Sequence, residues 1–377
     1  MKASLVQVLK GICLLIGLSS LTTFVSGGEA PDRVILFIID GLSVEAPEKI
    51  DMPHYNALKK EGVYYKAMHL PLAGHPEKSS EYPWNCSLAN PMLMSGTPFV
   101  GMEGIRESMI QHSFEPKEAA FIVNARSYID LSGGFGTYIS KPSNPDSLVI
   151  DITTEKMKEQ DFSFMRVHLQ RAGIEGMKVG WEKYSDKPYY QNIWHKESRY
   201  RDAVELADTQ LGRFMNWLKA EKLWEGTVLM ICGDHGQALE GWHEPYAEGS
   251  SETPLLIVGA GVSKPGTYEY CEIFDIAPTI TYLAKKQKPA LSHGRHGRIL
   301  QEAFDPNVEA PKVAQNVERL NDVLIKANAL DGAQKKLLSS KGFLTIDDLG
   351  KWHTTKVGTN FGQFVSLQES VFKDFNK

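Results

Sequence analysis

The stretch RVILFIIDG, Arg33–Gly41, constrains the fold more than any other part of the chain. Its apolar residues form a continuous run rather than an alternating pattern, so both faces of the strand that it predicts must be buried. Strands of this kind occur in parallel sheets that helices cover on both sides. The run stops at Asp40, which places a carboxylate directly after the strand. The sequence therefore predicts a buried parallel strand that ends in a polar side chain.

Three further apolar runs predict strands, namely FSFMRVHL (162–169), TVLMIC (227–232) and TPLLIVGAG (253–261). Residues 199–223 predict a long amphipathic helix, because apolar residues recur at the spacing of one helix face. These residues are Val204, Ala207, Leu211, Phe214 and Leu218. Strands that alternate with helices predict an α/β fold with an open, mostly parallel sheet flanked by helices.

Candidate metal ligands follow two of the predicted strands. Asp40 follows the first, Asp234 and His235 follow TVLMIC, and His243 comes shortly after them. Ligands of open α/β sheets lie outside the carboxyl ends of the strands, so we expect Asp40 and Asp234 to meet. Carboxylates and imidazoles together suit a divalent ion. We expect zinc, with manganese, magnesium or calcium as alternatives.

The charge and the N-terminus limit the partners of the protein. The 377 residues carry a net charge of −5, so we expect no nucleic acid partner. Residues 1–28 contain Lys2 and Lys10, an apolar run and then small residues, which is the layout of a secretory signal peptide. The apolar run is short for a membrane span. We therefore expect a secreted or periplasmic protein with no stable membrane span after signal removal.

The chain is predicted to have two parts after the signal peptide. Residues 32–304 contain the alternating strands and helices and form the predicted catalytic domain. Residues 305–377 predict a helical C-terminal extension, because apolar residues again keep helical spacing. They are Val313, Val317, Leu320, Leu324 and Ala327.

Five segments in this order resemble the alkaline phosphatase superfamily, in its phosphodiesterase, phosphoethanolamine transferase and sulfatase-like branches. VILFIIDGL (34–42) is similar to the first metal-ligand strand, and the segment that begins with GDHG (233–261) is similar to the Asp-His-Gly segment. The other three are the helix-containing segment 52–69, FDIAPTITYLAK (274–285) and HGRIL (296–300). The resemblance implies an alkaline-phosphatase-like fold. It also implies a metal-dependent hydrolase or transferase for phosphate or sulfate esters, either small molecules or groups linked to glycans or lipids.

The resemblance further implies a nucleophile at the start of a helix. In NCSLANPMLMSGTP, counting back ten residues from Gly96 reaches Cys86, and Ser87 is the next residue. Leu88 and Asn90 depart from the pattern that accompanies formylglycine in sulfatases, so we do not expect that modification. A nearby cation and the helix start would both lower the pKa of the Cys86 thiol, because both favour the anion.

The two-metal branches carry an Asp and, four residues later, a His, where this chain has Gln170 and Ile174. Glutamine offers one neutral oxygen and isoleucine offers no ligand atom. We therefore expect one tightly held ion, bound by the two aspartates and His235. We expect His243 and Gln170 to face the substrate or a weak second ion, with His243 assisting catalysis.

The same substitutions also fit a second class of function. A non-catalytic binding protein could retain the fold with a degenerate active site. The orientation of Cys86 separates the two hypotheses, because a sulfur that faces the metal ligands favours the enzyme and a sulfur turned into the core favours the binding protein.

Overall fold

A computed structural model describes residues 31–72, 85–97, 105–244, 246–263, 265–285, 296–311, 315–344 and 361–376. The predicted signal peptide, residues 1–28, lies outside the described residues. Among the helices that the structure describes, none is long and apolar enough to cross a membrane.

Eight strands form one sheet in the order β4-β3-β5-β1-β6-β7-β2-β8. All neighbours pair in parallel except β7, which is antiparallel to both β6 and β2. The predicted mostly parallel sheet is therefore confirmed. The strands are β1 (Arg33–Ile39), β2 (Val63–His69), β3 (Ala119–Val123), β4 (Thr137–Ser140), β5 (Phe164–Leu169), β6 (Thr227–Cys232), β7 (Glu252–Gly259) and β8 (Gly266–Glu272).

Strand β1 lies at the centre of the sheet and is buried along its whole length, as its continuous apolar run predicts. Successive side chains of a strand point to opposite faces, so β1 contributes to two cores. Leu36 and Ile38 pack into one core, and Ile35 and Phe37 pack into the other. The sheet is thus the middle layer of three.

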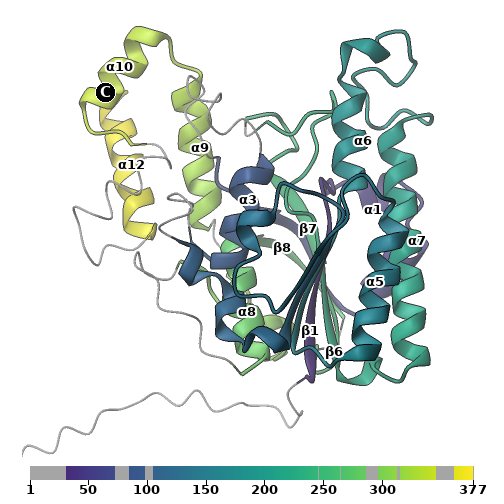
Figure 1. Ribbon diagram of the computed structural model, residues 1–377. Helices are drawn as coiled ribbons and strands as arrows, with labels where there is room; N and C mark the ends of the chain where they lie inside the picture. Colours follow the sequence, from purple (N-terminus) through teal and green to yellow (C-terminus); the bar gives the residue numbers. More distant parts are fainter. Residues whose placement is uncertain are drawn as a thin grey trace, which may run out of the picture.

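Helices cover both faces of the sheet (Figure 1). Helices α5, α6 and α7 lie on one side, and α3 and α8 lie on the other. The helices are α1 (Ala46–Lys49), α2 (Pro53–Lys59), α3 (Asn85–Ser95), α5 (Asp146–Glu159), α6 (Arg171–Val179), α7 (Arg199–Ala220), α8 (Ile276–Leu283), α9 (Asn316–Asn328), α10 (Gly332–Ser340) and α12 (Phe361–Phe375). Short 3-10 helices occupy Arg106–Ser108, Ile110–Ser113, Pro116–Glu118, Ile129–Leu131, Glu182–Tyr184, Trp224–Gly226, Ile273–Asp275 and Gln301–Ala303.

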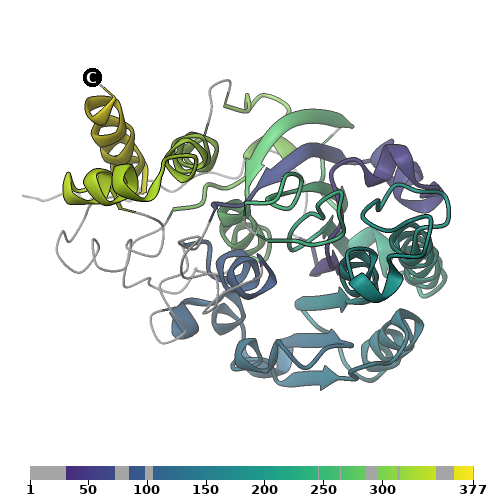
Figure 2. The same cartoon turned by 90° about the horizontal axis from the view of Figure 1, so that it is seen from above.

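The predicted helical C-terminal segment is present as α9, α10 and α12, which stand together at one side of the sheet (Figure 2). Val317 and Leu320 of α9 are buried in the same core as α3 and α8. The Val317 backbone N–H donates to Glu272 Oε1 at 2.9 Å, at the end of β8. Arg319 of α9 forms an ion pair with Glu369 of α12. The extension therefore packs on the sheet layer as well as on itself.

Helix α7 supplies a direct test of the predicted apolar face. Leu211 is fully buried, whereas Leu206 on the same helix is 48% exposed. We predict that Leu211→Ala lowers the free energy of unfolding by about 2–5 kcal/mol, because it removes packed methyl groups and leaves a cavity. The control Leu206→Ala should change it by less than about 0.5 kcal/mol. Urea denaturation followed by circular dichroism measures both, and equal losses would contradict the assigned face.

Candidate metal centre

Three parallel strands bring the candidate ligands to one edge of the sheet. Strand β1 pairs with β5 and with β6, and Ile39 lies opposite Leu169. The residues that follow these three strands are Asp40, Gln170 and the Gly233–Asp234 turn. Because parallel strands end at the same edge, Asp40 and Asp234 meet there, as the sequence predicted, and Gln170 lies beside Asp40.

Helix α3 and the segment after β6 complete a cluster of donor atoms. The Sγ atom of Cys86 lies 2.8 Å from His235 Nε2 and 3.4 Å from His243 Nε2. His235 Nε2 also lies 3.6 Å from Asp40 Oδ1 and 3.7 Å from Asp234 Oδ1. The ligand atoms of Asp40, Cys86, Asp234 and His235 all lie within 4.8 Å of one another. Neighbouring ligands of a tetrahedral zinc ion are about 3.4 Å apart at ordinary bond lengths, so this donor set fits such an ion.

Hydrogen bonding determines which nitrogen of His235 faces the cluster. Its Nδ1 lies 2.7 Å from the carbonyl oxygen of Gly236. Since a carbonyl can only accept, Nδ1 must carry the proton and donate it. The lone pair of Nε2 then points at Cys86, Asp40 and Asp234, which is the arrangement of an imidazole ligand supported by a backbone carbonyl.

The two oxygens of Asp40 have different surroundings. Its Oδ2 accepts from Tyr128 Oη at 2.9 Å and Gln170 Nε2 at 2.6 Å, and His168 Nε2 lies 3.4 Å away. Its Oδ1 is fully buried and has no hydrogen bond partner among the described residues. A buried carboxylate oxygen without a donor is costly unless a cation binds it. Asp40 therefore presents one oxygen to an ion, and other groups hold the second.

The two buried carboxylates have opposite pKa shifts. Burial and the neighbouring charge of Asp234 raise the pKa of Asp40 to about 8. Burial also opposes ionisation of Asp234, but His235, His168 and hydrogen bonds from Asn90 and the Gly41 backbone lower its pKa to about 2. At neutral pH Asp234 is thus ionised, and Asp40 holds a proton that a bound cation would displace.

The pKa of the Cys86 thiol is shifted in the direction opposite to the one expected from the sequence. Helix α3 begins at Asn85, so Cys86 lies at a helix start as predicted. However, burial of the sulfur and the charges of Asp40 and Asp234 raise the pKa of the thiol. These effects outweigh the hydrogen bond from Tyr128, which lowers the pKa. A thiol pKa below its ordinary value therefore requires a bound cation, which would offset the two carboxylates.

The other predicted site residues are also placed by the structure. His243 is buried and its ring stacks on that of His235, with centroids 4.2 Å apart. Ser87 is exposed, whereas the sulfur of Cys86 points at both histidines. Gln170 lies against Asp40 as an amide donor, and its Oε1 has no partner in the described part of the chain.

Four residues of the site were not assigned from the sequence, namely Asn90, Tyr128, Arg166 and His168. Arg166, His168 and Gln170 alternate along β5 and past its end, so they share one face of the strand. Asn90 follows Cys86 by one helical turn. Both patterns were available in the sequence. Tyr128 comes from a loop after β3, and no pattern links it to Asp40.

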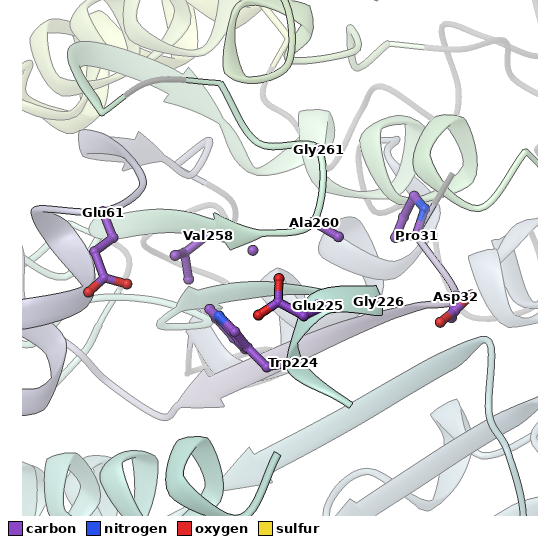
Figure 3. A pocket seen from close by; sticks show the side chains of 10 residues that line it. Pro31, Asp32, Glu61, Trp224, Glu225, Gly226, Val258, Ala260 and Gly261 are labelled. Carbon is purple, nitrogen blue, oxygen red and sulfur yellow. The ribbon is translucent and has the colours of Figure 1, made fainter. Parts of the chain in front are cut away.

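A separate cleft lies at the other edge of the sheet (Figure 3). It has a volume of about 610 Å³ and is lined by residues before β1 and β6 and after β7, among them Asp32, Glu225 and Gly261. Strands of this length extend roughly 20 Å, so the cleft is remote from Asp40 and Asp234. It contributes no residue to the cluster.

Comparison with known sequences finds sulfatases that match part of the chain. The sulfatase family profile matches residues 152–286. Arylsulfatase K of Gallus gallus is 21% identical over 255 residues, which cover 60% of this chain and 48% of that protein. The chain spans less than half the length of the curated relatives that it matches.

Two solved structures share the architecture. The lipoteichoic acid synthase LtaP from Listeria monocytogenes aligns with a TM-score of 0.52 and 17% identity, covering 70% of this chain and 74% of that chain. A protein in the alkaline phosphatase superfamily from Vibrio parahaemolyticus aligns with a TM-score of 0.50 and 16% identity, covering 77% and 72%. The chain has the alkaline phosphatase superfamily fold. The resemblance read from the sequence is confirmed. Within this superfamily fold, the sulfatase match includes Asp234, His235 and His243.

Gly173 gives a test of the Asp40 geometry. A Cβ atom at this position would lie 1.7 Å from Asp40 Oδ1, so any side chain there must displace the carboxylate. We predict that Gly173→Ala weakens zinc binding about 10–100-fold, the loss typical of a misplaced ligand. Isothermal titration calorimetry measures the affinity. Gly133→Ala is the control, because a Cβ atom at Gly133 meets nothing within 4 Å. Equal affinities of the two variants would contradict the assignment of Asp40 Oδ1 as a ligand.

Proposed function

We propose that the protein is an exported, metal-dependent hydrolase or transferase that acts on phosphate or sulfate esters. One observation carries the proposal: a helix-start thiol, two carboxylates and two imidazoles from three separate segments converge at the carboxyl edge of the sheet. The sulfur of Cys86 faces these ligands rather than the apolar core, which favours the enzyme over a non-catalytic binding protein.

We propose one tightly bound ion, with zinc as the preferred metal. Asp40, Asp234 and His235 would hold it, and the thiolate of Cys86 would complete the set. A thiolate and an imidazole suit zinc better than magnesium or calcium, which prefer oxygen ligands. Donors already surround Asp40 Oδ2, and Gln170 brings no charge, so a second ion lacks the anionic ligands that two adjacent divalent ions require.

The bound ion would polarise the ester and stabilise the Cys86 thiolate. His243, 3.4 Å from the sulfur, would accept the proton that Cys86 loses as its thiolate forms at the ion, and the thiolate would then attack the phosphorus or sulfur atom of the ester. The bond from that atom to the alcohol oxygen breaks, and His243 passes its proton to the leaving alkoxide. Burial and His235 lower the pKa of His243, so it releases the proton readily.

A second nucleophile would then complete the reaction. Water gives hydrolysis, releases phosphate or sulfate and restores the thiol, whereas an acceptor alcohol gives group transfer. Gln170 Oε1, which has no partner in the described part of the chain, could contact the substrate or a weak second ion.

The proposal places the protein outside the cytoplasm. The support is the sequence of residues 1–28, with its two lysines, apolar run and small residues. Substrates there would be small molecules or esters linked to glycans or lipids. The sulfatase match and the name of arylsulfatase K favour the sulfate ester, and the likeness to LtaP leaves the phosphate ester open.

Metal binding is the first test. We predict one zinc ion per chain by elemental analysis. Because Asp40 has a pKa of about 8 and the thiol pKa of Cys86 is raised, zinc must displace protons at neutral pH. Zinc affinity should therefore increase as the pH rises towards 8, with proton release measured by calorimetry in buffers of different ionisation enthalpy.

The ligand assignment has a matched control. Asp234→Asn should weaken zinc binding at least tenfold, and Asp151→Asn should not, because Asp151 is an exposed residue on α5. Two tightly bound ions per chain would refute the single-ion proposal. A zinc affinity unchanged by Asp234→Asn would refute the assignment of Asp234 as a ligand.

The nucleophile is the second test. We predict that Cys86→Ala lowers hydrolysis of generic aryl phosphate or sulfate esters at least 10³-fold, because no covalent intermediate can form. Ser87→Ala should retain activity, since Ser87 is exposed. Steady-state assays with both ester classes measure the rates. If only Ser87→Ala loses activity, the nucleophile is Ser87 and not Cys86. If the wild-type protein has no zinc-dependent activity, the non-catalytic binding protein becomes the favoured hypothesis.

A further inference from the structure

Arg166 of β5 is a buried cation that the proposed reaction does not use. Its side chain is fully buried, and its guanidinium carbon lies 4.6 Å from the ring centre of Phe121 and 5.6 Å from that of Tyr128. Among the described residues, no carboxylate lies within ion-pair distance of it. Burial of a guanidinium without a paired carboxylate is unfavourable, which indicates that Arg166 has a role other than packing. The two neutral groups that accept its hydrogen bonds define this role.

One of these neutral groups is the Asn90 amide. Arg166 Nη2 donates to Asn90 Oδ1. A guanidinium has no acceptor, so the oxygen of the amide must face Arg166 and its nitrogen must face the other way. Asn90 Nδ2 accordingly donates to Asp234 Oδ2 at 2.7 Å and to the Cys86 carbonyl oxygen at 2.9 Å. Arg166 thereby prevents the amide from flipping and keeps a donor on Asp234.

The other neutral group is the imidazole of His168. Arg166 Nη2 lies 3.1 Å from His168 Nδ1, which must accept because the guanidinium only donates. The proton of the neutral ring is then on Nε2, which lies 3.4 Å from Asp40 Oδ2. One cation thus sets the tautomer of His168 and keeps a donor on Asp40.

The two effects act on the same feature of the centre. Each carboxylate has one oxygen that accepts from a donor oriented by Arg166, and its other oxygen faces His235 Nε2 at 3.6 or 3.7 Å. In Asp234 this other oxygen, Oδ1, also accepts from the backbone N–H groups of Gly41 and His235. We propose that Arg166 is a positioning residue of the metal centre, which acts through Asn90 and His168 to determine which oxygen of Asp40 and of Asp234 faces the ion. This inference rests on the metal site of the proposed function.

The sign of the effect on metal affinity tests the inference. If Arg166 acted only through its charge, its removal would strengthen cation binding, because a repulsive positive charge would be lost. If it positions the carboxylates, its removal weakens binding. We expect Arg166→Met to weaken zinc binding about 10–100-fold and Arg166→Lys, which keeps a charged donor, to lie closer to the wild type. Arg33→Met is the control, because Arg33 is a buried arginine at the other edge of the sheet.

Cobalt substitution supplies a readout independent of activity. A thiolate-to-cobalt absorption band reports whether Cys86 is a ligand, and we expect Arg166→Met to weaken it at saturating cobalt. A double-mutant cycle with Asn90→Ala completes the test. If Arg166 acts through Asn90, the double variant should bind zinc no more weakly than the weaker of the two single variants. If circular dichroism shows that Arg166→Met does not fold, Arg166→Lys and Asn90→Ala carry the comparison.

The outcomes separate the two proposals. Wild-type protein that binds neither zinc nor cobalt overturns the proposed function, and this inference with it. The inference alone is overturned if the wild-type protein binds both metals but Arg166→Met binds zinc with equal or higher affinity and leaves the cobalt band unchanged. Additive effects of Arg166→Met and Asn90→Ala would also overturn it.

Discussion

The close approach of two buried carboxylates, Asp40 and Asp234, is the constraint on which the site depends. Both are fully buried, and each faces the same nitrogen of His235. Two anions in a region without water repel each other strongly. The protein relieves this repulsion partly by leaving Asp40 protonated near neutrality, and partly with donors on the outer oxygens. A divalent ion between the inner oxygens would remove the rest, so the site is built to favour a cation.

The parallel sheet brings the carboxylates together without placing them in the apolar cores. Because β5, β1 and β6 run in parallel, their polar end residues collect at one edge, while their apolar residues fill the cores on both faces. Helix α3 then brings Cys86 to the same edge. Asn90, one turn further along α3, ties the helix to Asp234. The thiol and the carboxylates are thus held in one hydrogen-bonded unit, although they come from distant parts of the chain.

Sequence patterns predicted the ligands whose position depends on short-range periodicity. The apolar run before Asp40 and the strand before Asp234 had to end at the same edge, since both are parallel strands. The resemblance to the alkaline phosphatase superfamily, through the distance to Gly96, implied that Cys86 lies at a helix start, and helix α3 begins at Asn85. The donors around these ligands were not predicted. Tyr128 reaches Asp40 from a loop, and Arg166 reads in the sequence as one polar residue inside an apolar strand.

The sequence by itself determined the kinds of donor atoms and the elements that carry them, because apolar periodicity dictates where strands and helices end. Only the tertiary structure decided which oxygen of Asp40 lacks a hydrogen bond among the described residues, which nitrogen of His235 carries a proton, and that the Cys86 sulfur rather than Ser87 faces the ligands. It also decided that the pKa of the thiol is raised without a cation. These properties depend on donors and charges a few ångströms away that belong to other segments, and hydrogen bonds between such segments have no periodicity along the chain.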